Sequence, residues 1–292
     1  MVMIDTKKEI SSYKAYMTLH NFKSSTVKAY CRTMDHFFEF ANVSHCDDLP
    51  TQDAVQRYLL KRIEDGKSWS TINADYSALR KYYKIMKDYP WSLKKLPRPK
   101  RDKKLPSLLS KEDVAKLINA APNYKYQVFL TFLYATGARL SEACHVKLED
   151  IDSNCMQIRI SQGKGGKDRY ILLPDRLLEL LRDYYVVYRP KKYLFNGRQV
   201  GSSYSASAGQ WTIRRARVLA GITKKCSIHT LRNCYATHHL ELGTDLVFLQ
   251  EQMGHKHLKT TAKYIRLCIE RYRLINHPLD VIKIRYLHPS IP

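Results

Sequence analysis

The organisation of this chain is decided by residues 228–266, which read IHTLRNCYATHHLELGTDLVFLQEQMGHKHLKTTAKYIR. Ser227 is a favoured N-cap residue, so we expect a helix to begin directly after it. A second helix is expected after Gly243, and Gly254, a frequent residue just past a helix end, should terminate it. Thr260 then opens a third helical segment. The stretch therefore predicts three successive helices with a glycine at each break.

Polar and basic side chains gather at the ends of these predicted helices. His229 and Arg232 stand three residues apart, so on a helix they share one face in its first turns. Free backbone N–H groups and the helix dipole favour anions at that end. His255 directly follows the glycine that ends the second helix, and the third segment carries Tyr264. Two histidines, an arginine and a tyrosine around an anion site indicate phosphate chemistry.

The whole chain is strongly basic. Its 292 residues include 50 Lys or Arg and 27 Asp or Glu, which gives a formal net charge of +23. Such an excess indicates a polyanionic partner, either nucleic acid or an anionic membrane surface. No run reaches the roughly 18 apolar residues that a membrane span needs, and the N-terminus lacks an apolar signal core. We therefore expect a cytoplasmic protein without membrane contact.

Cysteine usage favours neither a disulfide framework nor a zinc ribbon, because no Cys-x-x-Cys pair occurs. Cys226 and His229 have the spacing of two metal ligands, but no partner pair is evident. We expect seven buried, reduced thiols and no metal site. The seven are Cys31, Cys46, Cys144, Cys155, Cys226, Cys234 and Cys268.

The first 90 residues predict a four-helix bundle with a basic outer face. Its helices are expected near 6–20, from Ser24, from Thr51 to Gly66, and from Ser70. In the fourth helix, Arg80 and Lys84 lie opposite an apolar stripe.

The segment WSLKKLPRPKRDKKLP, residues 91–106, has the features of a linker. Its prolines stop helices and favour extended backbone. Lysines and arginines, Lys100 and Arg101 among them, fill the gaps, and their charge suits a phosphate backbone. The expected organisation is a helical domain at 1–92, a linker at 93–106 and a second domain at 107–292.

An arginine follows the most apolar helix of the second domain. That helix, expected at 126–134, is broken by Gly137, and Arg139 comes two residues later. Ser141 then starts a helix that contains Glu142. An arginine buried without a partner is costly. Arg139 therefore needs either Glu142 or a bound anion.

The hydrophobic period changes at 156–174, where alternating apolar residues predict a β-hairpin with a glycine-rich turn. Lys164 lies on that turn between glycines, so the backbone there can approach a ligand closely. An ordinary exposed hairpin lysine is the alternative. The spacing of a Walker-type phosphate loop is absent. Further helices are expected from Ser110, at 175–188 and at 211–220, with a polar loop at 196–210.

Six side chains that can act on a phosphate appear in an order and spacing that chance rarely gives. They are Arg139, Lys164, His229, Arg232, His255 and Tyr264. Their spacing, with the phrases ATGARLSE, GKGGKDR, HTLR, MGH and TTAKY, resembles the signature of the tyrosine recombinases. The phage-type integrases of the Xer-like or integron-integrase-like branch are most similar. The resemblance covers about 107–270. It implies a mainly α fold with a small antiparallel β-sheet, a SAM-like helical core-binding domain followed by an α+β catalytic domain.

The resemblance also implies a site-specific recombinase that cleaves and rejoins DNA without metal or cofactor. Tyr264 would attack the phosphodiester and form a 3′-phosphotyrosine, while Arg139 and Arg232 hold its non-bridging oxygens. Glu142 would brace Arg139.

Proton transfers would fall to the remaining three groups. Lys164 would protonate the 5′-oxygen that leaves, and His229 would assist the tyrosine as a base or hydrogen-bond partner. His255 would donate to a non-bridging oxygen.

The implied partners are double-stranded DNA and further copies of the chain, a dimer on one site and a tetramer in the synapse. The basic residues expected to contact DNA are Arg80, Lys84, Lys100, Arg101, Arg214 and Arg215. The tail after Tyr264 resembles a segment that packs on a neighbouring protomer, and docking on its own domain is the alternative. Its expected anchors are Leu267, Ile269, Tyr272 and Leu274.

Three other functions are considered. A type IB topoisomerase shares the chemistry but relaxes supercoils. His255 and His257 with a downstream tyrosine faintly resemble a metal-dependent nuclease, although no third ligand is apparent. A DNA-binding protein with a decayed site is disfavoured because every expected catalytic position is filled. Tyr272 is the fallback nucleophile.

Overall fold

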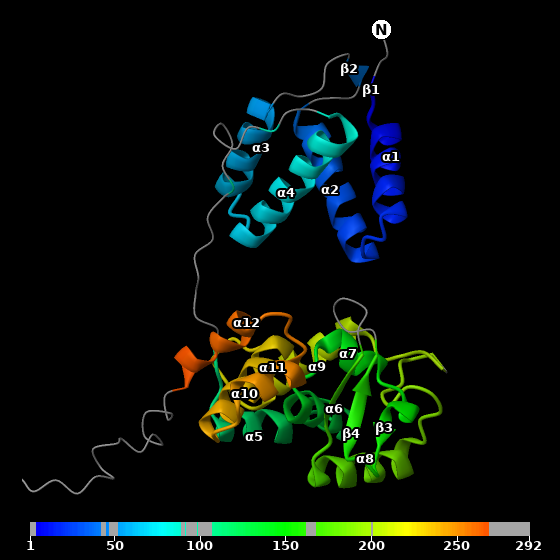
Figure 1. Ribbon diagram of the computed structural model, residues 1–292, viewed down its shortest axis with the longest axis vertical. Helices are drawn as coiled ribbons and strands as arrows, with labels where there is room; N and C mark the ends of the chain where they lie inside the picture. Colours follow the sequence, from blue (N-terminus) through cyan, green and yellow to red (C-terminus); the bar gives the residue numbers. More distant parts are fainter. Residues whose placement is uncertain are drawn as a thin grey trace, which may run out of the picture. The chain divides into compact units, whose positions relative to one another are not determined.

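The protein is mostly helical and divides into two compact units, residues 1–104 and 105–292. This computed structural model describes residues 4–41, 45–46, 52–88, 91, 98, 107–161, 168–199 and 201–268 (Figure 1). The predicted fold class, mainly α with a small antiparallel sheet, is confirmed. Apart from Arg98, the predicted linker at 93–106 lies outside the described residues.

The first unit contains the four predicted helices. They are α1 (Thr6–Leu19), α2 (Ser24–Phe40), α3 (Gln52–Glu64) and α4 (Trp69–Lys81), followed by the π-helical turn η1 (Tyr82–Met86), with a short antiparallel pair of β1 (Ile4–Asp5) and β2 (His45–Cys46). The fourth helix begins earlier than predicted, because the hydroxyl of Ser68, not Ser70, accepts the hydrogen bond from the Thr71 N–H.

Apolar and aromatic side chains fill the centre of this bundle, among them Tyr13, Phe37 and Tyr82. One charged group is also buried there. Asp75 on α4 accepts hydrogen bonds from the Thr33 hydroxyl (2.7 Å) and from Nε of Arg62 (3.1 Å). These bonds pair the carboxylate with partners on α2 and α3, which offsets the cost of burying it.

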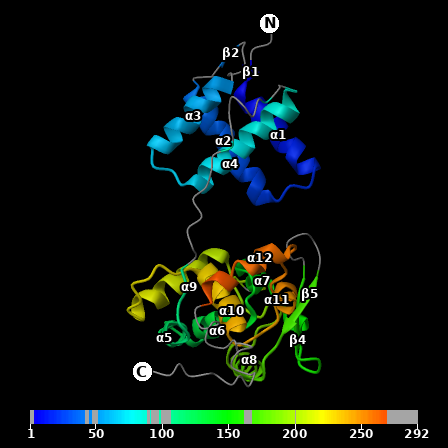
Figure 2. The same cartoon turned by 60° about the vertical axis from the view of Figure 1, so that its left-hand side comes forward.

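The second unit combines helices with a three-stranded antiparallel sheet of order β3-β4-β5. Its elements are α5 (Lys111–Asn119), α6 (Tyr124–Thr136), α7 (Leu140–His145), the 3-10 turn η2 (Leu148–Asp150), β3 (Ile151–Asp152), β4 (Gln157–Ile160), β5 (Arg169–Leu172), α8 (Asp175–Tyr188), α9 (Ala206–Leu219), α10 (Ile228–Glu241), α11 (Leu246–Met253), α12 (Leu258–Ala262) and the 3-10 turn η3 (Ile265–Leu267). The predicted hairpin is β4–β5, which pairs Ile158 with Ile171. In Figure 2, α11 lies beside β5.

Gly137 sets the path of the chain into the site. It ends α6 with φ +58°, a left-handed conformation that a glycine adopts without strain. A Cβ atom at this position would lie 2.3 Å from the ring of Tyr235 on α10. Only a glycine therefore lets α10 pass this close to the end of α6, two residues before Arg139.

Three predicted boundaries of the second unit are also wrong. α9 begins at Ala206, inside the predicted polar loop at 196–210, because Ser205 caps it and Gly209 packs against Leu140 and Phe129. α7 begins at Leu140, so Arg139 rather than a serine is its N-cap residue. α12 begins at Leu258, and Tyr264 lies past its end rather than within it.

Cys144, Cys234 and Cys268 are buried as predicted, and Cys31 and Cys226 are partly buried. The prediction that every cysteine is buried is wrong for Cys155, which is exposed. Its backbone N–H donates to the Asp152 carboxylate, and this bond holds it in the turn after β3. Among the described residues, no helix is both long enough and apolar enough to cross a membrane.

Candidate active site

Four of the six predicted catalytic side chains meet in the second unit. Arg139 comes from the start of α7, Arg232 from α10, His255 from the turn after α11, and Tyr264 from the turn after α12. The Arg232 guanidinium lies 3.1 Å from Nε2 of His255, and the rings of His255 and Tyr264 stack with centroids 6.3 Å apart. Arg139 donates to the carbonyl of Gly254, one residue before His255 (3.0 Å).

Arg232 is a buried cation held by backbone carbonyls. Its side chain donates to the carbonyl oxygens of Gly137 and Met253, and the residue is 2% exposed. Burial and then the charge of Arg139 lower its pKa to about 10. Arg232 therefore stays positively charged at neutral pH, in an orientation fixed by the ends of α6 and α11.

His255 is neutral, and its neighbours define its tautomer. A guanidinium can only donate, so Nε2 of His255 accepts from Arg232, and Nδ1 carries the proton that is donated to the Thr261 hydroxyl (2.9 Å). Burial first, and then the charges of Arg232 and Arg139, lower its pKa to about 3. Donation from Nε2 to a phosphate oxygen, the predicted role, therefore requires a proton that this nitrogen does not carry here.

Tyr264 is enclosed. It is 1% exposed, and its hydroxyl donates to Oδ1 of Asn233 on α10 (3.2 Å). The Lys263 ammonium lies 4.8 Å from the centre of its ring. Burial raises the pKa of Tyr264, while Arg232 and Arg139 oppose this rise. The phenol is thus protonated and turned toward Asn233, a residue to which the sequence gave no role.

His229 lies in the first turn of α10, as predicted. Much of its side chain is exposed. Partial desolvation, followed by the charges of Arg232, Lys263 and Arg139, lowers its pKa. His229 is therefore a neutral base at physiological pH, close enough to Arg232, Lys263 and Arg139 to be affected by their charges.

Glu142 contacts Arg139 twice, through the arginine backbone N–H (2.7 Å) and Nη1 (2.6 Å). The same carboxylate also accepts two bonds from Arg169 on β5, at 3.0 and 2.8 Å. Sequence reasoning missed Arg169, although it ends the phrase GKGGKDR. Only the pairing of β5 with its neighbours brings it to Glu142.

Several predicted residues cannot be placed. Lys164, Lys100, Arg101 and the tail from Ile269 onward, including Tyr272 and Leu274, lie outside the described residues. Within the described part of the chain, no group of three or more His, Cys, Asp or Glu side chains could hold a metal ion. His257 is the N-cap residue of α12.

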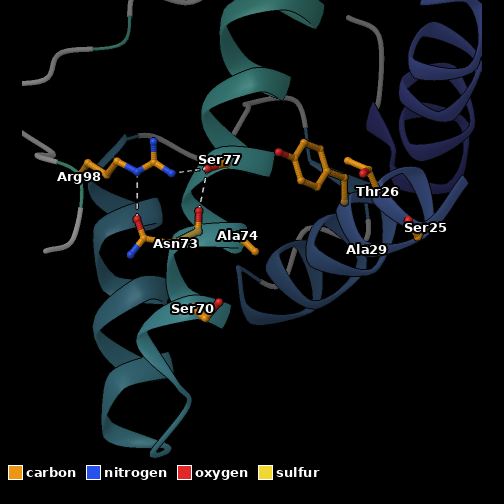
Figure 3. A pocket seen from close by; sticks show the side chains of 9 residues that line it. Ser25, Thr26, Ala29, Ser70, Asn73, Ala74, Ser77 and Arg98 are labelled. Carbon is orange, nitrogen blue, oxygen red and sulfur yellow. Dashed lines mark hydrogen bonds between the residues drawn. The ribbon is translucent and has the colours of Figure 1, made fainter. Parts of the chain in front are cut away.

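A polar groove lies between α2 and α4 of the first unit (Figure 3). It encloses about 560 Å³ and is lined by Ser25, Thr26, Ala29, Tyr30, Ser70, Asn73, Ala74, Ser77 and Arg98. The Arg98 guanidinium lies across Asn73 (2.9 Å) and Ser77 (3.4 Å). A neighbouring hollow of about 250 Å³ shares Arg98 and includes Arg80 and Lys84, two predicted DNA contacts. Arg214 and Arg215 are exposed on α9.

Two family models match the chain. The model described as "Phage integrase family" covers residues 107–271, more than half of the chain, and "Phage integrase, N-terminal SAM-like domain" covers 10–93. The chain belongs to the phage integrase family. It is therefore a tyrosine recombinase, as the sequence predicts.

Relatives matched over most of their own length are also integrases or recombinases by name. A putative integrase/recombinase, y4qK, of Sinorhizobium fredii is 33% identical over 91% of this chain and 86% of its own length. Tyrosine recombinase XerA of Thermococcus onnurineus is 31% identical over 90% and 92%. Tyrosine recombinase XerD of Staphylococcus aureus is 31% identical over 90% and 95%.

Solved structures share the integrase fold. A crystal structure of XerA recombinase is 27% identical, covers 93% of this chain and 100% of its own, and gives a TM-score of 0.53. A lambda integrase dimer bound to a COC′ core site is 18% identical, covers 97% and 81%, and gives a TM-score of 0.74.

Proposed function

We propose that this tyrosine recombinase cleaves and rejoins double-stranded DNA at specific sites, with Tyr264 as its nucleophile. The observation that carries the proposal is the convergence of Arg139, Arg232 and His255 around a single tyrosine. Two fork-shaped cations beside a hydroxyl suit a phosphodiester, whose non-bridging oxygens they can hold.

The cleavage step exchanges one phosphorus–oxygen bond for another. The phenol oxygen of Tyr264 bonds to phosphorus, and the bond from phosphorus to the 5′ oxygen breaks. His229 takes the phenol proton, and Lys164 gives a proton to the 5′ oxygen as it leaves. The products are a 3′-phosphotyrosine and a 5′-hydroxyl. The covalent bond conserves the phosphodiester energy, so reversal of these steps rejoins a strand without a nucleotide cofactor.

Arg139 and Arg232 stabilise the negative charge that grows on the phosphate. A single preorganised donor of this kind contributes roughly 10²- to 10³-fold to the rate. The carbonyls of Gly137 and Met253 orient Arg232 before DNA arrives. A bound phosphate also raises the pKa of the His255 ring, because a neighbouring anion favours its protonated form. The ring then gains the proton that it donates to a non-bridging oxygen.

The geometry described above is a resting state. The Tyr264 hydroxyl has to leave Asn233 before it can attack, and the enclosed ring has to become accessible to DNA. DNA binding supplies a phosphate that Arg139 and Arg232 hold, and this favours the state in which the Tyr264 hydroxyl faces the phosphate.

Basic and hydroxyl-bearing surfaces support DNA binding in both units. In the first unit, the groove between α2 and α4 offers hydroxyl and amide groups, and Arg80 and Lys84 lie beside it. In the second unit, Arg214 and Arg215 are exposed on α9. Lys100 and Arg101 are proposed as further phosphate contacts.

The proposed assembly is a dimer on one site and a tetramer in the synapse, in the cytoplasm on nucleoid DNA. Lambda integrase has been solved as a dimer on a core site and as a tetramer on a Holliday junction, and both share the present fold. Of the predicted anchors in the tail after Tyr264, Leu267 is buried in a cluster with Tyr235 and Leu249 of its own unit. The tail from Ile269 onward would then pack on a neighbouring protomer, with each Tyr264 serving its own site.

Trapping covalent complexes on fragmented genomic DNA tests this function. Denaturation in SDS should leave protein attached to 3′ ends, and the attached ends should share one sequence. Attached ends without a common sequence would refute site specificity. Exchange of strands between two labelled duplexes carrying that sequence separates a recombinase from a type IB topoisomerase, which would only relax a supercoiled plasmid.

A further inference from the structure

Glu142 is shared between two arginines from different parts of the second unit. Arg139, at the start of α7, takes one edge of the carboxylate, and Arg169, on β5, binds both oxygens. The side chains of Glu142 and Arg169 are only 6% and 13% exposed. A bidentate pair in this setting fixes the plane of the carboxylate as well as its position.

The sharing also sets the charge around Arg139. Glu142 carries one negative charge and two arginines bind it, so the trio keeps a net charge of +1 (two cations minus one anion). Burial disfavours the Glu142 carboxylate, but hydrogen bonds from Arg169 and its charge, followed by those of Arg139, lower its pKa to about 2. Arg139 is therefore braced by Glu142 without being fully neutralised, and it can still attract a phosphate.

Arg169 also supports the turn that carries His255. Its Nε donates to the carbonyl of Gln252 near the end of α11 (3.0 Å), and the Gln252 side chain accepts from the Leu172 N–H on β5 (2.8 Å). The side chain of Arg169 passes directly beside Gly254, where a Cβ atom would lie 2.9 Å from its Cδ. The Gly254 carbonyl in turn accepts from Nη2 of Arg139.

Arg169 thus touches both groups that hold Arg139 in place. We propose that Arg169 is a positioning residue for strand cleavage: by fixing Glu142 and the turn at Gly254, it orients the Arg139 guanidinium for the scissile phosphate. The proposal rests on the proposed function, and it assigns Arg169 an effect through Arg139 rather than a contact with DNA.

A double-mutant cycle tests this role on the DNA site recovered from wild-type adducts. The variants are Arg169→Met, Arg139→Lys and their combination. Arg169→Met should slow covalent adduct formation by roughly 10- to 100-fold and leave DNA affinity unchanged. This is less than the roughly 10²- to 10³-fold rate loss on removing one preorganised donor, because Arg139 itself is still present. In the Arg139→Lys background the same change should cost less than roughly threefold, because residues that act through one another are not additive.

Two further variants keep the test interpretable. Arg169→Lys retains the charge but loses the bidentate pair, so it should recover part of the rate, and it replaces the Met variant in the cycle if that variant does not fold. Arg159→Lys makes the same change at another arginine of the sheet, and it keeps a cation beside buried Asp150, which is the partner of Arg159 in place of a predicted catalytic group. It should leave the adduct rate within roughly twofold of wild type, as changes away from the site usually do.

The outcomes separate the two proposals. Independent, multiplicative losses in the double variant, or a loss of DNA affinity that accounts for the slower rate, would overturn the role of Arg169. A wild-type rate for both Arg169→Met and Arg169→Lys would do the same while leaving the proposed function intact. A wild-type protein that forms no adduct with DNA would instead refute the proposed function.

Discussion

Replacing Asn233 tests whether its hydrogen bond holds Tyr264 in reserve. The phenol is buried and donates to Asn233 at 3.2 Å, so Asn233→Ala leaves a buried hydroxyl without this partner. The net contribution of such a bond is about 0.5–1.5 kcal/mol. Because this bond exists only in the resting state, its loss favours release of the tyrosine by roughly two- to tenfold.

Two measurements follow from that magnitude. Adduct formation on the cognate site should be faster by up to roughly tenfold, and the melting temperature of the DNA-free protein should fall by about 2–4 °C. Asn233→Asp should slow adduct formation, because a hydroxyl donates a stronger hydrogen bond to a carboxylate than to an amide. Asn154→Ala, at an exposed position after β3, is the matched control and should change neither quantity.

Slower adduct formation by Asn233→Ala at unchanged stability would contradict a reserve role for the Asn233 hydrogen bond. That result would place Asn233 in the chemical step rather than in the resting state. A change in the rate of adduct formation in the same direction for Asn233→Ala and Asn233→Asp would also contradict this role.

Three other predictions concern electrostatics. DNA affinity should fall steeply with salt, and Arg214→Ala combined with Arg215→Ala should reduce the log–log slope by about 2, one unit per phosphate contact; an unchanged slope would exclude these residues from the interface. EDTA should leave cleavage intact, whereas a loss restored by added divalent metal would support the nuclease based on His255 and His257. Because the pKa of His255 is lowered to about 3, its contribution to stability is complete above pH 6.5 and is lost as the pH falls toward 3. His255→Gln should therefore flatten the decline in unfolding free energy between pH 7 and pH 5, by at most about 1.4 kcal/mol per pH unit; parallel curves for variant and wild type would contradict the buried neutral ring.

The sequence was sufficient where function depends on local pattern. Helical spacing put His229 and Arg232 on one face, and Gly254 ended α11 directly before His255. The apolar helix before Gly137 also indicated that Arg139 needs either Glu142 or a bound anion, and the structure pairs it with Glu142.

The contacts of Arg169 and Asn233 could not be predicted in the same way. Arg169 lies 27 residues from Glu142, and Asn233 lies 31 residues from Tyr264, so neither pair has a periodic signal. Each arises only when β5 and α10 pack against other elements of the unit. The early start of α9 has a similar cause. A glycine in a polar stretch predicts a loop, but Gly209 lies within α9 because Leu140 and Phe129 pack closely against it.

The central claim is that Tyr264 becomes covalently attached to DNA. The direct measurement compares SDS-stable adducts of wild type, Tyr264→Phe and Tyr272→Phe on the cognate site, with the attached peptide identified by mass spectrometry. We predict that wild type and Tyr272→Phe carry the nucleotide on Tyr264, while Tyr264→Phe binds the same DNA with unchanged affinity and forms no adduct. An SDS-stable adduct of Tyr264→Phe would contradict the account.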